Sequence, residues 1–528
     1  MNLLKLNFNL LLLVITATAN TNSIIGFGSE TIGGKGGVEY HINSFKELVT
    51  ALKNNGNPNA SKIIYIDSPL NGLMDENGKT YTAEDLLPEY SFEEYIKCFT
   101  EDGSAWYDTE ECNKINEIRK SGISIQDSLT RAYITSNTTI IGHGDKTPIE
   151  EISFYLKNIN NVIIRNLSIE APNDLFPAWS VEDGKHGAWK AEYDNIVIRN
   201  TTNVWVDNCY LTDGKKHIGT APKIFGQYID KHDGLLDIVQ KSDSITISNN
   251  RFQSHRKTML IGNGDNKTED RGFLRVTLYN NVFIDCAERL PRVRFGKVHI
   301  FNNFYYAESF NPAYPSLTIE NYFHDDVTAN PQYFIGLGVE SNILSEYNSF
   351  NFVGNDDIPA TTDIIVFSYG GYTFHDEGSE YNGASINVDE IAEKSFKFKA
   401  EVTINQNALN GNINPDWVNA TYTSETFQPR DFYDYELNKN IDEVNDLINK
   451  VPTWMFDIDS FDDPESTFDL ETEFITEGYD LKTESNTKEY DLETESITEG
   501  YGLETESITE GYDLETESIT EKYNDIYY

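Results

Sequence analysis

RVTLYNNVFIDCAERLPRVRFGKVHIFNNFY, residues 275–305, contains two copies of one short unit. In each copy a run of β-branched and aromatic residues, RVTLY or KVHIF, is followed by Asn-Asn and then by a second apolar run. This alternation predicts two short strands joined by a tight turn. Asn suits the turn because it tolerates the left-handed backbone conformation.

The unit recurs between Thr138 and about Asn351, as NVIIRNLSIE (161–170), NIVIRNTTNVWVDNCYL (195–211) and SITISNNRF (244–252). The second Asn of the pair falls at positions 250, 281 and 303. Because no helical segment intervenes, we expect the strands to stack in parallel as coils of a β-helix, an all-β solenoid, with each Asn bonding its copy one coil above. The alternative is an antiparallel sandwich with Asn-Asn hairpins, although these pairs lack the Gly that two-residue hairpins favour.

The segments on either side predict other structure. Residues 20–66 contain a strand (VEYHI), an amphipathic helix over SFKELVTALKN with Ser44 as N-cap, which would cap the N-terminal end, and a strand (KIIYID). Residues 71–132 are polar, with a helical segment ending near Lys120, and predict a long inserted loop region, either a subdomain or the wall of a groove. Residues 310–455 keep strand-like runs, including DIIVFSY and FKAEVTI, which indicates the last coils and a C-terminal flank.

The first 19 residues predict a signal peptide, with a basic start (MNLLK), an apolar run and the small residues Ala17-Thr18-Ala19. No later stretch has the length of apolar sequence that a membrane span needs, so we expect a secreted, extracellular protein. In that oxidising setting Cys98 and Cys112 predict a disulfide, whereas Cys209 and Cys286 follow strands and predict buried thiols. Sequons that predict a glycoprotein lie at Asn59, Asn137, Asn166, Asn200, Asn266 and Asn419.

The chain is strongly acidic, with a net charge of −45. Residues 466–528 hold 19 Asp and Glu against three Lys, and a Tyr recurs there every 11 residues from Tyr479 to Tyr523. One-signed charge and low apolar content predict a disordered repeat tail. The predicted organisation is therefore a signal peptide over 1–19, a β-helix domain over 20–455 and an acidic tail over 456–528.

Basic residues gather in this acidic chain at Lys257, Arg289, Arg292 and Arg294, which indicates that an anion is held there. Because residues alternate in a strand, we expect Arg292, between Arg289 and Arg294, to point to the other face and to form a salt bridge. We expect Trp179 either to line a sugar subsite or to pack in the interior. His232 and His255 predict structural hydrogen bonds.

Four stretches, EYDNIVIRNTTNVWVDNCYLTDG, HDGLLDI, HRKTMLIGNGD and ERLPRVRFGKVHIFNN, resemble the signature stretches of the secreted pectate lyases of polysaccharide lyase family 1. They occur in matching order and spacing, and the similarity runs from Gly26 to at least Phe352. The resemblance implies a right-handed parallel β-helix and β-elimination of α-1,4-linked polygalacturonate in plant cell-wall pectin, giving unsaturated oligogalacturonides. One departure is Asn208, where the family commonly has the His of WIDH; we expect Asn208 to be structural.

The resemblance also implies a calcium site, because Asp194, Asp233 and Asp237 match the calcium-binding carboxylates and Glu192 is a further candidate ligand. Calcium takes six to eight oxygens, so three Asp leave positions open for substrate carboxylates. HDGLLD alone is a weak signal, since acidic residues at this spacing are common in solvated turns.

Arg289 matches the base that removes the proton, and Lys257 and Arg294 match the residues that bind the substrate carboxylate. An arginine base is unusual because its pKa exceeds ~12. Positive neighbours favour its neutral form, so the sequence predicts an alkaline optimum.

Other functions remain open at this point. A pectin lyase would act on methyl-esterified chains without calcium, a glycoside hydrolase would need a pair of carboxyl groups as acid and base, and a non-catalytic solenoid would only bind the cell wall. We expect no nucleic-acid or membrane partner, and a monomer.

Overall fold

The computed structural model describes residues 24–75, 77–143, 147–183, 187–309, 332–355 and 359–451. The predicted signal peptide (1–19) and acidic tail (456–528) lie outside these residues. In the described ranges no helix has the length and apolar composition to cross a membrane.

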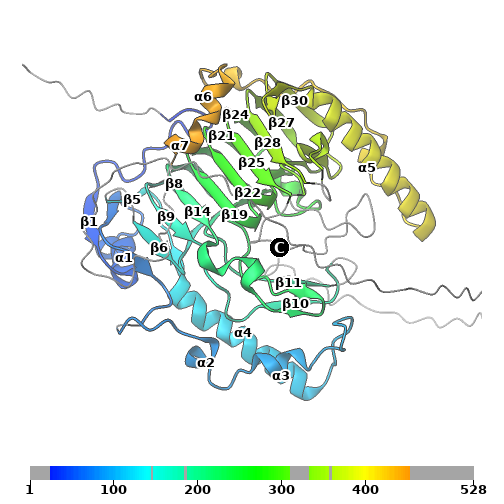
Figure 1. Ribbon diagram of the computed structural model, residues 1–528. Helices are drawn as coiled ribbons and strands as arrows, with labels where there is room; N and C mark the ends of the chain where they lie inside the picture. Colours follow the sequence, from blue (N-terminus) through cyan, green and yellow to red (C-terminus); the bar gives the residue numbers. More distant parts are fainter. Residues whose placement is uncertain are drawn as a thin grey trace, which may run out of the picture. The chain divides into compact units, whose positions relative to one another are not determined.

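Three long sheets form the body of the molecule (Figure 1). The first sheet runs in the order β1 (Val38–Ile42), β2 (Lys62–Ile66), β5 (Thr138–Gly142), β8 (Asn160–Arg165), β13 (Thr202–Asp207), β18 (Asp243–Ser248), β21 (Arg275–Tyr279), β24 (Lys297–Phe301), β27 (Asn342–Glu346) and β30 (Thr373–Glu377). The second sheet runs in the order β4 (Arg131–Tyr133), β7 (Ser153–Lys157), β12 (Ile196–Arg199), β17 (Leu236–Val239), β20 (Leu260–Ile261), β23 (Arg292–Val293), β26 (Ile335–Leu337) and β29 (Val366–Ser368). The third runs in the order β3 (Leu70–Asn71), β6 (Pro148–Glu150), β9 (Ser168–Glu170), β14 (Tyr210–Thr212), β19 (Arg251–Lys257), β22 (Val282–Glu288), β25 (Phe304–Glu308), β28 (Ser349–Val353), β31 (Glu380–Tyr381) and β32 (Ala384–Ser385).

Each complete coil passes through the second, first and third sheets in turn, as in β20, β21 and β22, and pairs in parallel with the next coil. Apolar side chains from all three sheets fill the interior and stack from coil to coil. The rings of Phe252, Phe283 and Tyr305, for example, lie 4.9 Å apart at each step. The parallel β-helix is confirmed, and the antiparallel sandwich is excluded because the neighbouring strands run in the same direction.

The Asn-Asn pairs lie at the turn from the first sheet to the third, and the two members of each pair have different roles. The first members, Asn249, Asn280 and Asn302, have φ of 54°, 54° and 53°. The second members are fully buried, and Asn281 Oδ1 accepts from Asn250 N at 3.0 Å while Asn303 Oδ1 accepts from Asn281 N at 2.9 Å. We name Asn250, Asn281, Asn303 and Asn348 the asparagine corner. The predicted ladder is confirmed.

Asn208 also has a positive φ, and its side chain donates to Asn166 Oδ1 at 2.9 Å, so its structural role is confirmed. Cys209 and Cys286 are buried free thiols, as predicted.

Helices close both ends of the stack (Figure 1). In α1 (Phe45–Lys53), Ser44 accepts from Glu47 N, and Leu48, Ala51 and Leu52 join the core, which confirms the N-terminal cap. At the other end lies α5 (Val388–Asn410), so the strand predicted over FKAEVTI is wrong. This segment forms a helix instead of a strand because Asn387 caps it and because apolar residues four apart, from Val388 to Ala400, bury one face of the helix against the last coils. The short helices α6 (Ile441–Asn445) and α7 (Leu447–Lys450) follow.

The insertion forms a subdomain with its own apolar cluster. It contains α2 (Ala83–Leu86), α3 (Phe92–Ile96) and α4 (Glu110–Thr130), and it packs on two hairpins from later loops, β10–β11 (Ala178–Ser180 and Ala188–Lys190) and β15–β16 (Lys223–Ile224 and Gln227–Tyr228). The Cys98–Cys112 disulfide is present. α4 continues well beyond the predicted end near Lys120 and carries Arg119, Gln126 and Thr130 into the interior.

Candidate active site

Charged residues gather where the chain passes from the third sheet to the second, in four successive coils. Asp194 precedes β12, Asp233 precedes β17, Lys257 ends β19 and Arg289 lies between β22 and β23. With Asp237 on β17, we name these five residues the charged corner. The parallel coils therefore bring together residues that are nearly 100 positions apart in sequence, which the four sequence stretches predicted.

Two carboxylates of the charged corner converge on Gly234. A Cβ built on Gly234 would lie 2.6 Å from Asp237 Oδ1 and 2.7 Å from Asp194 Oδ1. Gly234 N donates to Asp194 Oδ1, and Leu260 N donates to Asp237 Oδ1 at 3.0 Å. Glycine is required here because any side chain would fill the space between these two oxygens.

The raised pKa values of Asp194 and Asp237 indicate that too little positive charge lies near these two carboxyl groups. Burial and repulsion from Asp237 and Asp233 raise the pKa of Asp194 well above its ordinary value. Burial and repulsion from Asp233 raise the pKa of Asp237 to about 7. A divalent cation would relieve both effects, and an all-oxygen set fits a hard cation such as calcium.

The other two candidate ligands are held by basic residues. Asp233 Oδ1 lies 2.8 Å from Lys257 Nζ, and the attraction of Lys257 lowers the pKa of Asp233 although burial opposes it. Glu192 Oε1 lies 3.1 Å from Arg131 Nη2. The structure thus brings Asp194 and Asp237 together and places Asp233 and Glu192 beside them in ion pairs.

Arg289 lies two coils from Asp233 and Asp237 and three coils from Asp194. Its carbonyl oxygen accepts from Met259 N at 2.8 Å, and the next residue, Leu260, donates its N–H to Asp237. Its φ of 65° turns the chain out of the strand, and its Nε has no hydrogen-bond partner among the described residues. Burial lowers the pKa of Arg289, but Glu288, Tyr333 and Asp237 outweigh it and hold the pKa above its ordinary value.

Lys257 and Arg294, the predicted carboxylate-binding residues, each have an acidic partner. Lys257 Nζ also lies 3.0 Å from Asp230 Oδ2. Arg294 Nε pairs with Asp265 Oδ1, and burial together with Arg292 lowers the pKa of Arg294 to about 10. Both cations are thus fixed in place before any ligand arrives.

The prediction for Arg292 is wrong. Residues two apart in a strand share a face, so Arg292 lies on the same side as Arg294. It pairs with Leu260 on the neighbouring strand, and its guanidinium lies 3.7 Å from the ring centre of Tyr369. No carboxylate among the described residues lies within ion-pair distance of Arg292. Counting the two-residue period of a strand from Arg294 would have predicted the correct face for Arg292.

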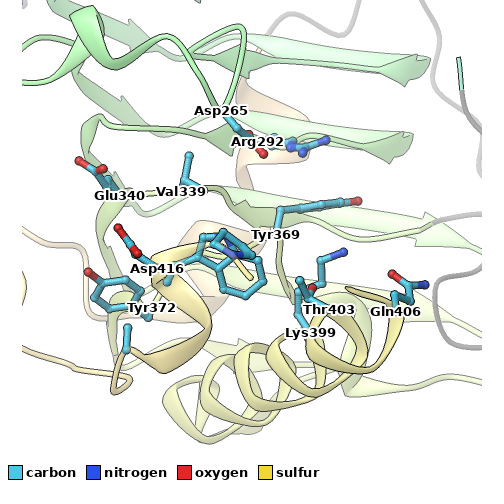
Figure 2. Close-up of a pocket in the computed structure, with 13 residues that line it drawn as sticks. Asp265, Arg292, Val339, Glu340, Tyr369, Tyr372, Lys399, Thr403, Gln406 and Asp416 are labelled. Atoms are coloured by element: carbon cyan, nitrogen blue, oxygen red, sulfur yellow. The ribbon is translucent and has the colours of Figure 1, made fainter. Parts of the chain in front are cut away.

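Arg292 also lines a cavity of about 790 Å³ between the second sheet and α5. Figure 2 shows Arg292, Tyr369 and Lys399 on one side of it and Glu340, Tyr372 and Asp416 on the other. Arg271 pairs with Glu340, and Arg294 pairs with Asp265, so two of the three acidic groups that line the cavity are neutralised. Burial and repulsion from Arg292 lower the pKa of Lys399.

Sequence reasoning did not find one further residue that shapes the site. Gly234 gave no signal beyond the HDG triplet. His255 lies between the Asp213 carboxylate, 2.6 Å from its Nδ1, and the Asp233 carbonyl oxygen, 2.7 Å from its Nε2. His232 makes comparable contacts with two carbonyl oxygens, so both histidines have structural hydrogen bonds, as predicted. Trp179 is buried and its Nε1 donates to Gly103 O at 2.8 Å, which makes it a packing residue.

Comparison with known proteins identifies the family. The family described as "Pectate lyase" matches residues 109–419. The chain is 34% identical over 370 residues to a pectate lyase of Bacillus subtilis (strain 168), covering 69% of this chain and 83% of that one. It is 40% identical over 275 residues to pectate lyase E of Dickeya dadantii (strain 3937), covering 51% and 63%. A solved structure, "Pectate lyase bound to hexasaccharide", superposes with a TM-score of 0.65 at 28% identity, covering 82% of this chain and 98% of that one.

The match includes every residue of the charged corner and the coils that carry it. With this fold and this extent of similarity, the chain belongs to the pectate lyase family.

Proposed function

We propose that this protein is a secreted, calcium-dependent pectate lyase that cleaves polygalacturonate by β-elimination. The observation that carries the proposal is the pair of carboxylates at Gly234, in the same charged corner as Lys257 and Arg289, in a chain of this family. A glycoside hydrolase would need an acid and a base that are both carboxyl groups, whereas here a guanidinium stands opposite the carboxylates.

Asp194 and Asp237 would hold the calcium ion, with Asp233 as a third ligand and Glu192 as a more distant one. When bound, calcium would neutralise the uronate carboxylate and stabilise the negative charge that develops as the neighbouring proton leaves. The raised pKa values of Asp194 and Asp237 support this assignment because they mark carboxylates that lack a counter-charge.

Arg289 acts as the base. In its neutral form, a guanidine nitrogen accepts the proton from the carbon next to the uronate carboxylate. The electron pair of that C–H bond forms a double bond to the next ring carbon, and the glycosidic oxygen leaves and takes a proton from water. Asp233 and Asp237 now help to keep Arg289 charged, so neutralising them favours the form that can accept a proton.

Lys257 and Arg294 bind the carboxylate of the reacting sugar, and Arg292 binds that of a neighbouring sugar. The polymer carries one carboxylate per residue, so several cations on neighbouring coils can each bind one carboxylate. Arg offers two parallel N–H groups to a carboxylate, which fixes its orientation as well as its position.

The test is to mix the protein with polygalacturonate and follow the ultraviolet absorbance of the unsaturated product with calcium and with a chelator. We expect absorbance to rise only with calcium. A rise with methyl-esterified pectin and chelator would indicate a pectin lyase, and new reducing ends without absorbance would indicate hydrolysis. If neither signal appears on any substrate, the protein is a non-catalytic binder and the proposal is wrong.

A further inference from the structure

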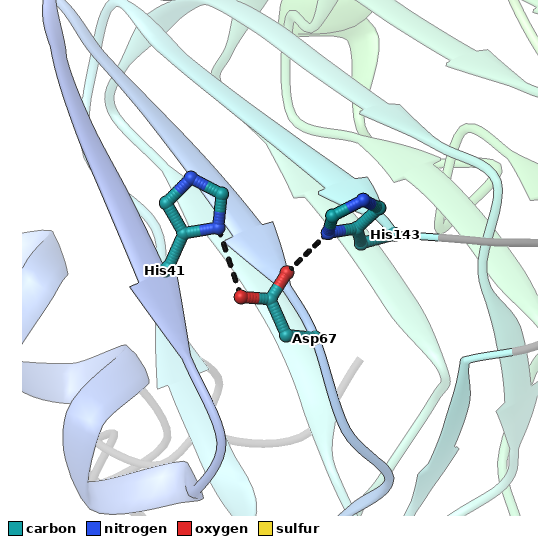
Figure 3. A group of neighbouring side chains, drawn as sticks. All are labelled: His41, Asp67 and His143. Atoms are coloured by element: carbon teal, nitrogen blue, oxygen red, sulfur yellow. Dashed lines mark hydrogen bonds and ion pairs between the residues drawn. The ribbon is translucent and has the colours of Figure 1, made fainter.

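A second group of ligating side chains lies on the first sheet, away from the charged corner. His41 belongs to β1, Asp67 directly follows β2 and His143 directly follows β5, and these three strands are neighbours (Figure 3). The backbone ladder continues past the strand ends, because Asp67 N donates to Ile42 O and His143 N donates to Ile66 O, both at 3.0 Å. The hydrogen-bonded backbone of these strands therefore fixes the positions from which the three side chains extend.

The three side chains meet at one carboxylate. His41 Nδ1 lies 2.8 Å from Asp67 Oδ2, and His143 Nδ1 lies 2.7 Å from Asp67 Oδ1. One ligating atom from each residue can be chosen so that all three lie within 4.8 Å of one another. The side chains of His41 and His143 are 55% and 65% exposed, so a solvated ion can reach them. The ring of Tyr65 stacks on His41 with centroids 4.8 Å apart and supports one side of the group.

We propose that His41, Asp67 and His143 form a binding site for a divalent first-row transition metal such as zinc. A neutral imidazole that carries its proton on one nitrogen offers the lone pair of the other, and two imidazoles with one carboxylate are a ligand set that zinc accepts. Tetrahedral zinc with bonds of about 2.0–2.1 Å separates its ligands by about 3.4 Å, which small rotations of these exposed side chains supply. Water completes the shell.

The ligand chemistry separates this site from the charged corner. Calcium prefers oxygen ligands and gains little from imidazole, whereas zinc, nickel and copper favour it. The metal would join three successive strands at the end of the solenoid that α1 covers. Since the unfolded chain does not hold these residues together, binding would stabilise the folded state.

The test is calorimetric titration of zinc into the full-length protein at mildly alkaline pH, with calcium present to occupy the oxygen site. We expect a zinc site in the wild type that weakens at least tenfold in His41→Asn and in His143→Asn. The matched control is His375→Asn, because His375 Nδ1 also lies 3.0 Å from a carboxylate, that of Asp389, but belongs to no three-residue ligand group among the described residues. Wild-type affinity in the control supports the proposal. Absence of zinc binding in the wild type, or unchanged binding in the His143 variant, overturns it.

A second measurement covers the case in which a variant is destabilised. Zinc should raise the melting temperature of the wild type and of His375→Asn, and leave that of the His41→Asn/His143→Asn double variant unchanged. All of these variants should keep the wild-type rate on polygalacturonate, so failure of the metal site and failure of the lyase activity are told apart. An equal zinc-induced shift in the double variant would contradict the site.

Discussion

At the asparagine corner, successive coils repeat one residue, and Asn250, Asn281, Asn303 and Asn348 bond one to the next. At the charged corner, the same stack of coils contributes unlike residues, with three carboxylates, a lysine and an arginine in place of copies. The first corner is a tight turn of two residues. The connections at the second corner range from two residues, Thr258 and Met259 between β19 and β20, to the long loops that precede β12 and β17.

The two corners also differ in how completely their polar groups are satisfied. Asn281 Oδ1 accepts two hydrogen bonds and its Nδ2 donates to Ile247 O and Asn303 Oδ1. At the charged corner, by contrast, Asp194 and Asp237 have raised pKa values and Arg289 Nε has no hydrogen-bond partner among the described residues. The comparison indicates that the ladder supplies stability. This stability allows the other corner to hold charges in an unfavourable arrangement, which a cation and an anionic substrate would complete.

The largest expected effect is on catalysis at the charged corner. Arg289→Lys keeps the positive charge but removes the guanidine that accepts the proton, so kcat should fall by about 10³-fold or more, the range of a general base. Calcium affinity and the melting temperature should change little. Arg251→Lys, on the third sheet beside Gln253, is the matched control and should retain full activity. A normal rate in the Arg289 variant would refute its role as base.

The next effect is on stability at the asparagine corner. Asn281→Ala leaves Asn250 N–H without a partner in the interior and removes the side-chain hydrogen bond to Ile247 O, which should lower the free energy of unfolding by about 3 kcal/mol. Denaturant unfolding measures the change, with the exposed Asn160→Ala as control. At a temperature where the variant is folded, its activity should equal that of the wild type. A loss of less than about 0.5 kcal/mol would show that the ladder does not stabilise the solenoid.

Replacing one metal ligand tests the charged corner in a different way. Asp237→Asn keeps the shape but removes a charge, so calcium should bind about ten- to a hundredfold more weakly by calorimetry. Asp376→Asn is the matched control: this buried carboxyl of β30 accepts hydrogen bonds from Ser345 and Ser379 and lies outside the site. If both variants bind calcium like the wild type, Asp237 is not a ligand.

Calcium binding should also depend on pH through Asp237. Its pKa is raised to about 7, so below that pH the carboxyl is protonated and must lose the proton before it can bind calcium. Apparent calcium affinity should therefore fall as the pH decreases through 7, by up to about tenfold per pH unit. Calorimetry of the wild type across this range should show the fall and Asp237→Asn should lose this step. An affinity independent of pH would contradict the assignment.

The smallest effect is expected at the cavity under α5. Lys399→Ala should raise KM for polygalacturonate roughly fivefold, the equivalent of about 1 kcal/mol, with kcat unchanged. The matched control is Lys397→Ala on the same helix, whose side chain is exposed and paired with Glu393. Equal KM values for Lys399→Ala and wild type on the polymer would show that the substrate does not extend there.

The repeating parts of the fold were predictable because local sequence determines them. The Asn pairs predict the turn because Asn tolerates a positive φ. The regular spacing of the pairs predicts that successive coils stack on one another. Ser44 and the apolar positions after it predicted α1. In contrast, FKAEVTI looks like a strand on its own, and only the packing of α5 on the last coils makes it helical.

The sequence predicted which residues belong to the site, but it did not predict how these residues are arranged in space. The motifs identified Asp194, Asp237 and Arg289, whereas the space at Gly234 depends on how two loops approach each other. The predicted orientation of Arg292 was wrong because strand alternation was counted from Arg289. Arg289 has a positive φ and lies outside the strand, so the count does not apply across it. The Lys257–Asp233 pair could not be inferred either, since both residues were assigned to other partners.

The most direct test of the charged corner is a crystal structure of the protein with calcium and an oligogalacturonate. We predict a calcium ion bound by Asp194 and Asp237 beside Gly234, and a guanidine nitrogen of Arg289 about 3–3.5 Å from the uronate carbon that loses its proton. A calcium ion bound elsewhere, or Arg289 separated from that carbon by the width of a sugar or more, would contradict the account.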